Sequence, residues 1–383
     1  MKNWRIGGNE IKYVNELLSG GFPGKQSRNF AGELERCFAE KFGTKYAISF
    51  TNGTATLHAA LVACGVKAGD EVIVPPLTMS STSLAVLHAG AIPVYADVDP
   101  ETFVLTPETV KPHITSKTKA IMPVNLYGLP AVTPEFIAFA EGYNIPVIED
   151  SAQCFLSKVG NKYAGTVGAV GSFSFQNSKH MTCGEGGITV TDDPEKAAIM
   201  RRFSSLGYGQ ISAEPGKSKI DKNAIASPDT IRHVDYGFNF RLSEVCAAVA
   251  LAQLEQLDGF VIARQKCAEA FLEVIDGCRF LRVQKTPEGI TNSYWTVALR
   301  LDQNVVSWKE FQQEFLKNGG DGFYGAWRLA YQEPFFAELY PQISCPVAED
   351  LQRNMIQLKT HYDFDTDIPQ QLSALKAVIA KYN

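Results

Sequence analysis

The chain has 383 residues, of which 45% are hydrophobic, and a formal net charge of −5. This length is sufficient for a large hydrophobic core and a second, smaller domain. Lysine and arginine are scattered and form no basic block, which argues against a nucleic-acid partner. The eight cysteines form no C-x-x-C pair, so we expect buried thiols in a reducing compartment.

The chain shows no signal for export or membrane insertion. Its first residues carry charges but are not followed by the apolar run of a secretory signal. No apolar stretch approaches the ~20 residues that a membrane-spanning helix requires. We therefore expect a soluble, cytoplasmic protein with no membrane partner.

Short apolar strands alternate with helices over the first 150 residues. A helix is predicted at 30–42 from the spacing of its apolar residues. Strands are then expected at 46–50, 71–75, 93–97, 119–124 and 146–150, with helices ending near residue 64 and lying near 80–89, 107–113 and 133–143. Strands that are apolar throughout and alternate with helices predict an α/β fold, in which helices cover both faces of a parallel sheet.

The pattern changes after residue 170. Two close strands are expected at 171–175 and 187–191, and the polar residues 209–233 predict a long loop. A long amphipathic helix is expected at about 242–275, followed by further strands and helices, of which the strand at 294–301 is the clearest.

The domain organisation follows from this order. We expect a large domain over residues 1–250 and a smaller carboxy-terminal α/β domain over residues 251–383. The long helix would link the two.

Lys179 lies between a short aromatic strand and a Gly-Glu-Gly-Gly turn. A lysine amine that is desolvated and partly neutral can condense with a carbonyl, and the prime carbonyl held this way is that of pyridoxal 5′-phosphate (PLP). The default for a lone lysine is a solvated surface position. The aromatic strand and the close glycines Gly184, Gly186 and Gly187 favour a buried one instead.

PLP requires a carboxylate against its ring nitrogen and a cradle for its phosphate. Asp150 ends a buried strand at the carboxyl edge of the sheet, where open α/β sheets bind ligands, and Gln153 follows it closely. Gly53 and Thr54 offer N–H groups and a hydroxyl at a helix start, and the Ser174 hydroxyl would reach the same phosphate. Each of these is also explained alone as an ordinary cap or turn, but together they indicate a PLP site.

Other patterns carry less weight. Gly165, Gly168 and Gly171 have the spacing G-x-x-G-x-x-G rather than G-x-G-x-x-G, which argues against a nicotinamide-dependent oxidoreductase. His180 is expected to be a neutral neighbour directed away from Lys179, since adjacent residues rarely face the same side. The sequence contains no metal-ligand cluster with convincing spacing, no Walker motif and no Ser/His/Asp trio.

Taken together, the motifs resemble the DegT-type sugar aminotransferases, which are PLP-dependent enzymes of fold type I. The resemblance covers nearly the whole chain in order, through Asn52-Gly-Thr, Val72-Ile-Val-Pro, Leu126-Tyr-Gly, Glu149-Asp150, Ser172-Phe-Ser-Phe, Gly184-Glu-Gly-Gly and Gly237-Phe-Asn-Phe-Arg241. It implies a large domain with a mostly parallel, seven-stranded sheet flanked by helices, and a smaller carboxy-terminal α/β domain.

The resemblance also implies roles for individual residues. Lys179 would be the Schiff-base lysine, Asp150 the partner of the protonated ring nitrogen, and Gln153 the partner of the ring oxygen. In catalysis the Lys179 amine would move a proton between the substrate and the cofactor.

Further residues are implied around the phosphate and the ring face. Gly53, Thr54 and Ser174 would hold the phosphate, and Asn239 would reach the phosphate of the other subunit's cofactor, which implies a homodimer with shared active sites. Met79 stands where the family usually has an aromatic residue on the pyridine ring.

The implied reaction is a ping-pong transamination from glutamate to a keto or aldehydo sugar. The segments 320–327 and 358–361 are similar to the branch that forms 8-amino-3,8-dideoxy-D-manno-octulosonate, a lipopolysaccharide sugar, from the 8-oxo sugar acid. The carboxylate of this acid would require a cation, for which Arg241, Arg328 and Lys359 are the candidates.

Several alternatives stay open at this point. The acceptor is alternatively a nucleotide-linked keto sugar or a keto-inositol, and the donor is alternatively glutamine. A sugar dehydratase on the same scaffold would have His in place of the lysine, so the intact Lys179 argues against it. A PLP-holding regulator would bind the cofactor without turnover.

Overall fold

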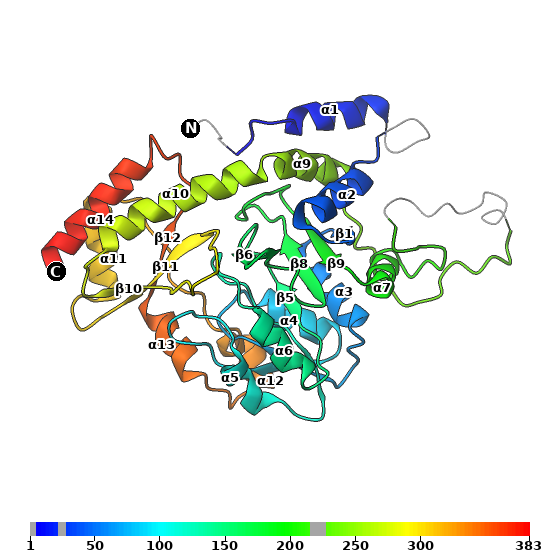
Figure 1. Cartoon of the computed structure of the whole chain (residues 1–383), viewed down its shortest axis with the longest axis horizontal. Coiled ribbons are helices and arrows are strands. Elements are labelled where there is room, and N and C mark those ends of the chain that lie inside the picture. The colour runs from blue at the N-terminus through cyan, green and yellow to red at the C-terminus, as the bar shows by residue number, and fades with distance from the viewer. Residues whose placement is uncertain (1–4, 22–27, 215–226) are drawn as a thin grey trace.

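The computed structural model describes residues 5–21, 28–214 and 227–383. Its main sheet is a seven-stranded array in two parts, and the strands of the first part lie at the centre of Figure 1. One part of the array is a four-stranded sheet, in the order β1 (Tyr46–Phe50), β9 (Gly187–Thr191), β8 (Val170–Ser174) and β5 (Ile148–Asp150). The other part is a three-stranded sheet, in the order β4 (Thr118–Ile121), β2 (Glu71–Val74) and β3 (Ile92–Tyr95).

Parallel bridges join the two parts at Ile121–Val147 and at Val124–Asp150. Among the seven strands only β9 runs antiparallel to its neighbours. The expected fold, a mostly parallel sheet within an α/β protein, is therefore confirmed. The carboxyl ends of the six parallel strands meet at one edge, which is where ligands bind in such sheets.

Helices pack on both faces of this sheet (Figure 1). The helices before and within the sheet are α1 (Glu10–Gly20), α2 (Phe30–Phe42), α3 (Gly53–Ala63), α4 (Ser81–His88), α5 (Pro107–Val110), η1 (Lys111–His113), α6 (Pro134–Glu141), α7 (Pro194–Ser204) and α9 (Glu244–Glu255). A small hairpin of β6 (Lys158–Val159) and β7 (Lys162–Tyr163) lies between β5 and β8.

Each face of the sheet has its own hydrophobic core, because successive side chains of a strand point to opposite faces. In β1, for example, Ile48 and Phe50 belong to the core with α3, and Ala47 belongs to the core with α1, α2 and α9. Phe173 of β8 meets Phe38 of α2 edge-on, with ring centroids 5.2 Å apart. The aromatic strand before Lys179 thus packs beneath α2.

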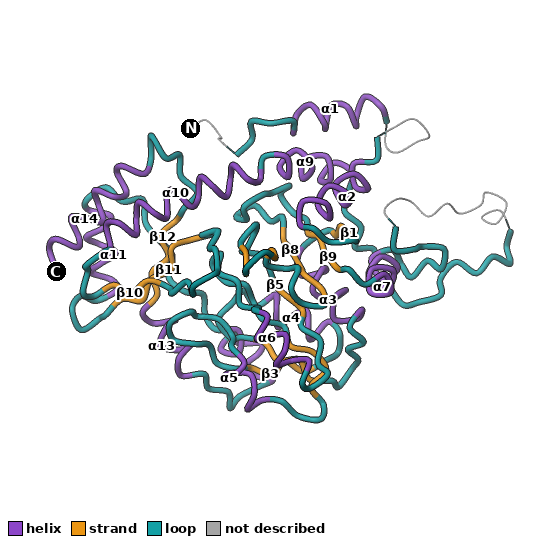
Figure 2. The backbone as a smooth tube through the Cα atoms, in the orientation of Figure 1, coloured by secondary structure: helices purple, strands orange, loops and turns teal. Residues whose placement is uncertain are grey.

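The carboxy-terminal part forms a separate lobe around a third core (Figure 2). The elements that form this core are α10 (Leu257–Ile275), β10 (Leu281–Val283), β11 (Thr296–Leu301), α11 (Trp308–Lys317), β12 (Met355–Lys359) and α14 (Ile368–Tyr382). The intervening η2 (Ala330–Gln332) and α13 (Pro346–Asn354) instead pack on the core with α3, and α12 (Pro334–Leu339) contacts η2. The strands form an antiparallel sheet in the order β10-β11-β12. We propose this lobe as the core of the second domain, with the boundary near residue 250.

The expectation of a single linking helix at 242–275 was wrong, because the chain forms two helices there. These helices, α9 and α10, meet at Gln256 with a bend of 60°. The helix α9 packs against α1 and α2, whereas α10 begins on that same core at Leu257 and Val261 and continues on the core of the carboxy-terminal lobe from Cys267. Within the described residues no single helix is long and apolar enough to cross a membrane, and α9 with α10 meets that test only as this bent pair.

The loop expected at 209–233 is described only in part. Residues 209–214 and 227–233 contain no helix and no named strand, as predicted. The remainder of the predicted loop lies outside the described residues.

Gly171, in β8, has no space for a side chain because the backbone of Gly165 packs against it, and this explains why glycine occurs at both positions. A Cβ atom at Gly171 would lie 1.8 Å from the carbonyl oxygen of Gly165. We expect Gly171→Ala to destabilise the protein by about 3 kcal/mol, because backbone atoms must move to admit the methyl group. Urea unfolding measures the change.

A matched variant, Gly259→Ala, changes a glycine of α10 whose Cβ would meet nothing within 4 Å. It should be neutral or slightly stabilising because alanine has the higher helix propensity. Equal stability of the Gly171 variant and the unmodified protein would contradict the close contact.

Candidate active site

A cavity with about 1020 Å³ of empty space opens at the carboxyl edge of the sheet. Segments that follow β1, β2, β4, β5 and β8 line it, and so does one residue of the carboxy-terminal lobe, Trp327. The structure brings together most of the residues predicted to bind the cofactor, namely Gly53, Thr54, Met79, Asp150, Gln153, Ser174 and Lys179. The strand topology positions them, since β1, β5 and β8 all end here.

Lys179 is buried, with 8% of its surface exposed, so the solvated surface position is excluded. Its Nζ atom lies 5.1 Å from the centre of the Trp295 ring. Burial lowers the pKa of this amine from 10.5 to about 8, against the opposing effect of the Asp150 charge. About a tenth of the amine is therefore neutral at pH 7, and the neutral form is the one that attacks a carbonyl.

Hydrogen bonds from distant parts of the chain hold the backbone at Lys179 in place. Its carbonyl oxygen accepts hydrogen bonds from Arg5 near the amino terminus and from Arg264 of α10, the latter at 3.5 Å. The Trp295 indole N–H donates to the carbonyl of Ser178 at 2.8 Å. None of these three residues was found from the sequence, because no local motif marks them.

Asp150 is buried at the end of β5 with 4% exposure. Its Oδ2 accepts a hydrogen bond from the Thr82 hydroxyl at 2.9 Å, and its Oδ1 accepts one from the N–H of Ala152 at 3.2 Å. Burial raises the pKa of this carboxyl, and Thr82 and Lys179 oppose the rise. A protonated pyridine nitrogen would supply the charge partner that a buried carboxylate requires, so Asp150 fits PLP. Sequence analysis missed Thr82.

Glu149, the neighbour of Asp150, faces away from the cavity and has a structural role. Its carboxylate accepts backbone hydrogen bonds from Gly165, Val167 and Gly168, each at 2.7 Å. Asn125 donates to it as well, at 3.0 Å. The glycines that suggested a dinucleotide motif therefore surround this carboxylate, and Asn125 belongs to the same network rather than to a substrate pocket.

The amino-terminal end of α3 provides donors for an anion. The Asn52 side chain caps Ala55 N–H at 2.8 Å, while the N–H groups of Gly53 and Thr54 lie in the first turn, where no intrahelical acceptor exists. A Cβ atom at Gly53 would lie 2.8 Å from the Cβ of Ser174, so only glycine allows this approach. Helix-start donors beside a serine hydroxyl fit the phosphate of PLP.

Two other residues complete the lining. Gln153 accepts a hydrogen bond from Tyr127 N–H through Oε1 at 3.1 Å, which leaves its amide NH₂ group to donate to a ligand oxygen. Met79 lies at the cavity edge and is 53% exposed. His180 is buried, its Nε2 lies 3.1 Å from the Ser293 carbonyl, and burial holds its pKa well below 6.5, so it is neutral as expected.

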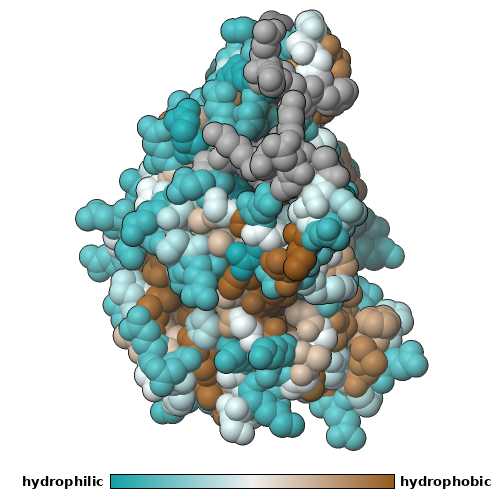
Figure 3. Space-filling model, turned by 90° about the vertical axis from the view of Figure 1, so that its right-hand side faces the viewer, coloured by the Kyte–Doolittle hydropathy of each residue, from teal (hydrophilic) through white to brown (hydrophobic). Residues whose placement is uncertain are grey.

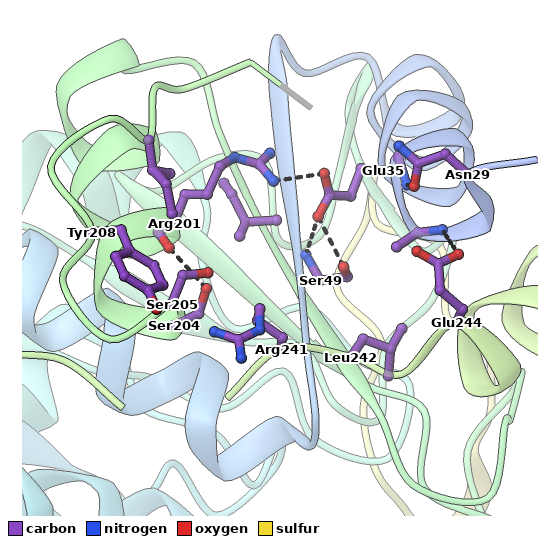
Figure 4. Close-up of a pocket in the computed structure, with 14 residues that line it drawn as sticks. Asn29, Glu35, Ser49, Arg201, Ser204, Ser205, Tyr208, Arg241, Leu242 and Glu244 are labelled. Atoms are coloured by element: carbon purple, nitrogen blue, oxygen red, sulfur yellow. Dashed lines mark hydrogen bonds and ion pairs between the residues drawn. The ribbon is translucent and has the colours of Figure 1, made fainter. Parts of the chain in front are cut away.

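The remaining candidates do not line this cavity within one chain. Asn239 is exposed and pairs through its backbone with Ser205. Arg241 lines a different cavity, beside the buried ion pair between Arg201 and Glu35 (Figure 4). Arg328 is exposed outside the cavities described, and Lys359 lines a cavity that adjoins the one with Lys179.

Comparison with known proteins identifies the family of the chain. The model of the DegT/DnrJ/EryC1/StrS aminotransferase family matches residues 5–374. The chain is 34% identical over 347 residues to GDP-perosamine synthase of Escherichia coli O157:H7, which covers 90% of this chain and 88% of that protein.

Solved structures extend the comparison to the fold. An aminotransferase from Psychrobacter cryohalolentis superposes with a TM-score of 0.87 at 28% identity, covering 97% of both chains. The E. coli GDP-4-keto-6-deoxy-D-mannose-3-dehydratase, solved with bound hydrated PLP, superposes with a TM-score of 0.85 at 25% identity, covering 98% of both chains.

These likenesses confirm the predicted fold type I and the predicted dependence on PLP. An amino donor and a keto sugar are the substrates of such enzymes. The chain belongs to the DegT/DnrJ/EryC1/StrS aminotransferase family and is a PLP-dependent sugar aminotransferase.

Proposed function

We propose that the enzyme moves an amino group from glutamate to a keto or aldehydo sugar by a ping-pong reaction, with Lys179 as both the covalent attachment point of PLP and the acid–base group. The observation that carries this proposal is the buried Lys179 amine, with a pKa of about 8, in one cavity with Asp150. PLP supplies an electron sink for the substrate carbon when it is bound. The Lys179 amine would take the proton from that carbon and pass it to the cofactor within the same half-reaction, and it would move a proton in the opposite direction in the second half-reaction.

The other lining residues orient the cofactor in this proposal. Asp150 holds the proton on the ring nitrogen, and Gln153 donates to the ring oxygen. Gly53, Thr54 and Ser174 anchor the phosphate. Because the anchor and Asp150 belong to the same sheet edge, the ring is held rigidly beside the lysine.

We infer a homodimer in which Asn239 reaches the cofactor phosphate of the second copy. Asn239 is exposed, and so are apolar side chains that precede it, Ile231 at 78%, Val234 at 56% and Tyr236 at 79%. Figure 3 views the molecule from the side of α7, and apolar surface gathers in the middle of this face between polar side chains. Exposed apolar side chains of this size are typical of an interface.

For the acceptor we propose the 8-oxo sugar acid that gives 8-amino-3,8-dideoxy-D-manno-octulosonate, with a role in lipopolysaccharide synthesis. Lys359, in the cavity next to Lys179, supports an acidic acceptor. A nucleotide-linked keto sugar is the second candidate, and the 34% identity to GDP-perosamine synthase favours it.

The test uses the purified enzyme loaded with PLP. Glutamate is expected to convert the visible absorbance of the bound cofactor to that of its amine form, and glutamine serves as the comparison donor. The 8-oxo sugar acid should restore the original spectrum faster than GDP-linked or other nucleotide-linked keto sugars or a keto-inositol. A spectrum unchanged by either donor would contradict the transaminase and favour a PLP-holding regulator.

A further inference from the structure

A second cavity, with about 1000 Å³ of empty space, adjoins the cofactor cavity on the side of the carboxy-terminal lobe. Ser178 and Trp327 line both cavities, so the two lie next to each other. Trp295, whose ring lies 5.1 Å from the Lys179 Nζ, also lines the second cavity. A molecule bound at Lys179 can therefore extend into it.

The charged side chains that line this second cavity are positive. Among the described residues, its lining includes Arg5 and Lys359 but no aspartate or glutamate. Arg5 donates to the backbone carbonyls of Asn177 and Lys179 and forms no ion pair with any acid in the part of the chain that the structure describes. Its Nε atom is buried and has no hydrogen-bond partner within residues 5–21, 28–214 and 227–383.

Arg264, which lies behind Trp295 of this cavity, adds a second positive charge that has no acidic partner among the described residues. It is 1% exposed and donates to the carbonyl of Trp295 and the hydroxyl of Thr360, each at 3.0 Å, rather than to an acid. Burial lowers its pKa to about 9, and the charge of Arg5 contributes to that decrease. Positive charge that is buried without a counter-ion is costly, and a bound anion would offset the cost.

His361 responds to the same field. His361 is exposed to solvent, and desolvation by neighbouring atoms, followed in order by the charges of Arg264, Arg5 and Lys359, lowers its pKa. It is therefore neutral at pH 7 and offers a hydrogen bond beside the two cations. The one acid that opposes this effect, Asp321, lies 3.3 Å from the Lys359 Nζ but has a side chain 43% exposed, so water screens its charge.

We propose that this second cavity is a carboxylate subsite that serves both half-reactions, first binding a carboxylate of the amino donor and then the carboxylate of an acidic sugar. In a ping-pong reaction the donor product leaves before the acceptor binds, so both substrates meet the same groups. Lys359, Arg5 and His361 supply the charge and the hydrogen bonds, and Trp295, Tyr324 and Trp327 pack against the carbon chain. This inference rests on the proposed function.

The first test measures binding without turnover. Glutarate is a dicarboxylate that lacks an amine, so it cannot react, and calorimetry on the PLP-loaded enzyme gives its affinity. We expect Lys359→Met to weaken glutarate binding by about 10-fold or more, because a charge-assisted hydrogen bond is lost. Lys359→Arg should retain most of the affinity.

Lys285→Met is the matched control. Lys285 also pairs with one acid, Glu101 at 2.6 Å, but it lies outside the second cavity. This variant should bind glutarate as the unmodified enzyme does. Melting temperatures of all the variants exclude a loss of binding through unfolding.

The second test separates binding from chemistry. In the glutamate half-reaction, Lys359→Met should raise the KM at least about 10-fold, with a maximal rate that changes little. An unchanged KM together with unchanged glutarate affinity would overturn the subsite. The proposed function would still stand, since the unmodified enzyme would convert its cofactor spectrum with glutamate.

Pyrophosphate provides the remaining arm. One outcome is that pyrophosphate binds the unmodified enzyme but not Lys359→Met, while glutarate binds neither protein. The cations would then bind the phosphates of a nucleotide, and the proposal of a carboxylate subsite would be wrong. If glutarate binds and pyrophosphate does not compete with it, the subsite for carboxylates is supported.

Discussion

Lys179→Met is expected to abolish covalent attachment of PLP and to lower the rate of amine transfer by at least about 10⁴-fold. The variant loses the only proposed acid–base group of the site, and general acid–base catalysis alone contributes up to about 10⁴ in rate. The visible absorbance of the attached cofactor and single-turnover rates with glutamate measure the two effects. Methionine is of similar length, so the cavity changes little in volume.

The same variant is expected to be more stable than the unmodified protein when both are free of cofactor. The pKa of Lys179 is lowered from 10.5 to about 8 in the folded chain. A buried amine with a lowered pKa destabilises the fold at pH 7, by about 3 kcal/mol, because the unfolded chain holds the proton more tightly. The penalty is complete below pH 8 and disappears as the pH rises towards 10.5, so the two proteins should converge there in urea unfolding.

Lys179→Arg is the control for charge. A guanidinium keeps the positive charge but does not lose its proton, so this variant should be as inactive as the methionine variant. It should not gain stability at pH 7, because the buried charge remains. Amine transfer at more than a few per cent of the normal rate in either variant would disprove the role of the lysine.

Asp150→Asn is expected to lower amine transfer by about 10³-fold while PLP still attaches to Lys179. The change keeps the shape of the side chain and removes its charge, and one preorganised electrostatic partner is worth about 10²–10³ in rate. Thr82 can then accept a hydrogen bond from the new amide instead of donating one, so the fold should be preserved. Half-reaction rates with glutamate and the absorbance of the attached cofactor measure the effects.

The melting temperature of the Asp150→Asn variant shows whether a loss of activity comes from the chemistry or from unfolding. Burial raises the pKa of Asp150, so its charged form costs stability at pH 7, and the cost fades only as the pH falls and the group is protonated in both states. Without cofactor, Asp150→Asn should therefore melt at the same temperature as the unmodified protein or higher. Thr82→Val is a milder control, which removes one donor to the carboxylate at 2.9 Å. Full activity of the asparagine variant would contradict the proposed role of Asp150.

The amino-acid sequence by itself determined the alternation of strands and helices, the α/β fold and most of the residues that line the cavity with Lys179. It did so because these features depend on neighbours in the chain. Apolar strands, helix caps and a lysine before close glycines are local patterns with a local physical reason.

Other features were decided only by the tertiary structure. The sequence pair Glu149-Asp150 does not show which acid enters the cavity. Backbone N–H groups of Gly165, Val167 and Gly168 bind the Glu149 carboxylate, which leaves Asp150 for a ligand. The break between α9 and α10 is a tertiary feature, because α9 packs on the core with α1 and α2 whereas most of α10 packs on the core of the carboxy-terminal lobe.

The cation candidates show the same limit. Arg241 and Lys359 were indistinguishable as sequence letters, yet they line different cavities. Thr82, Arg5 and Arg264 approach the site from segments 68, 174 and 85 residues away from their partners. Contacts of this kind exist only after the sheet, its helices and the carboxy-terminal lobe have packed together, so no periodicity or motif in the chain encodes them locally.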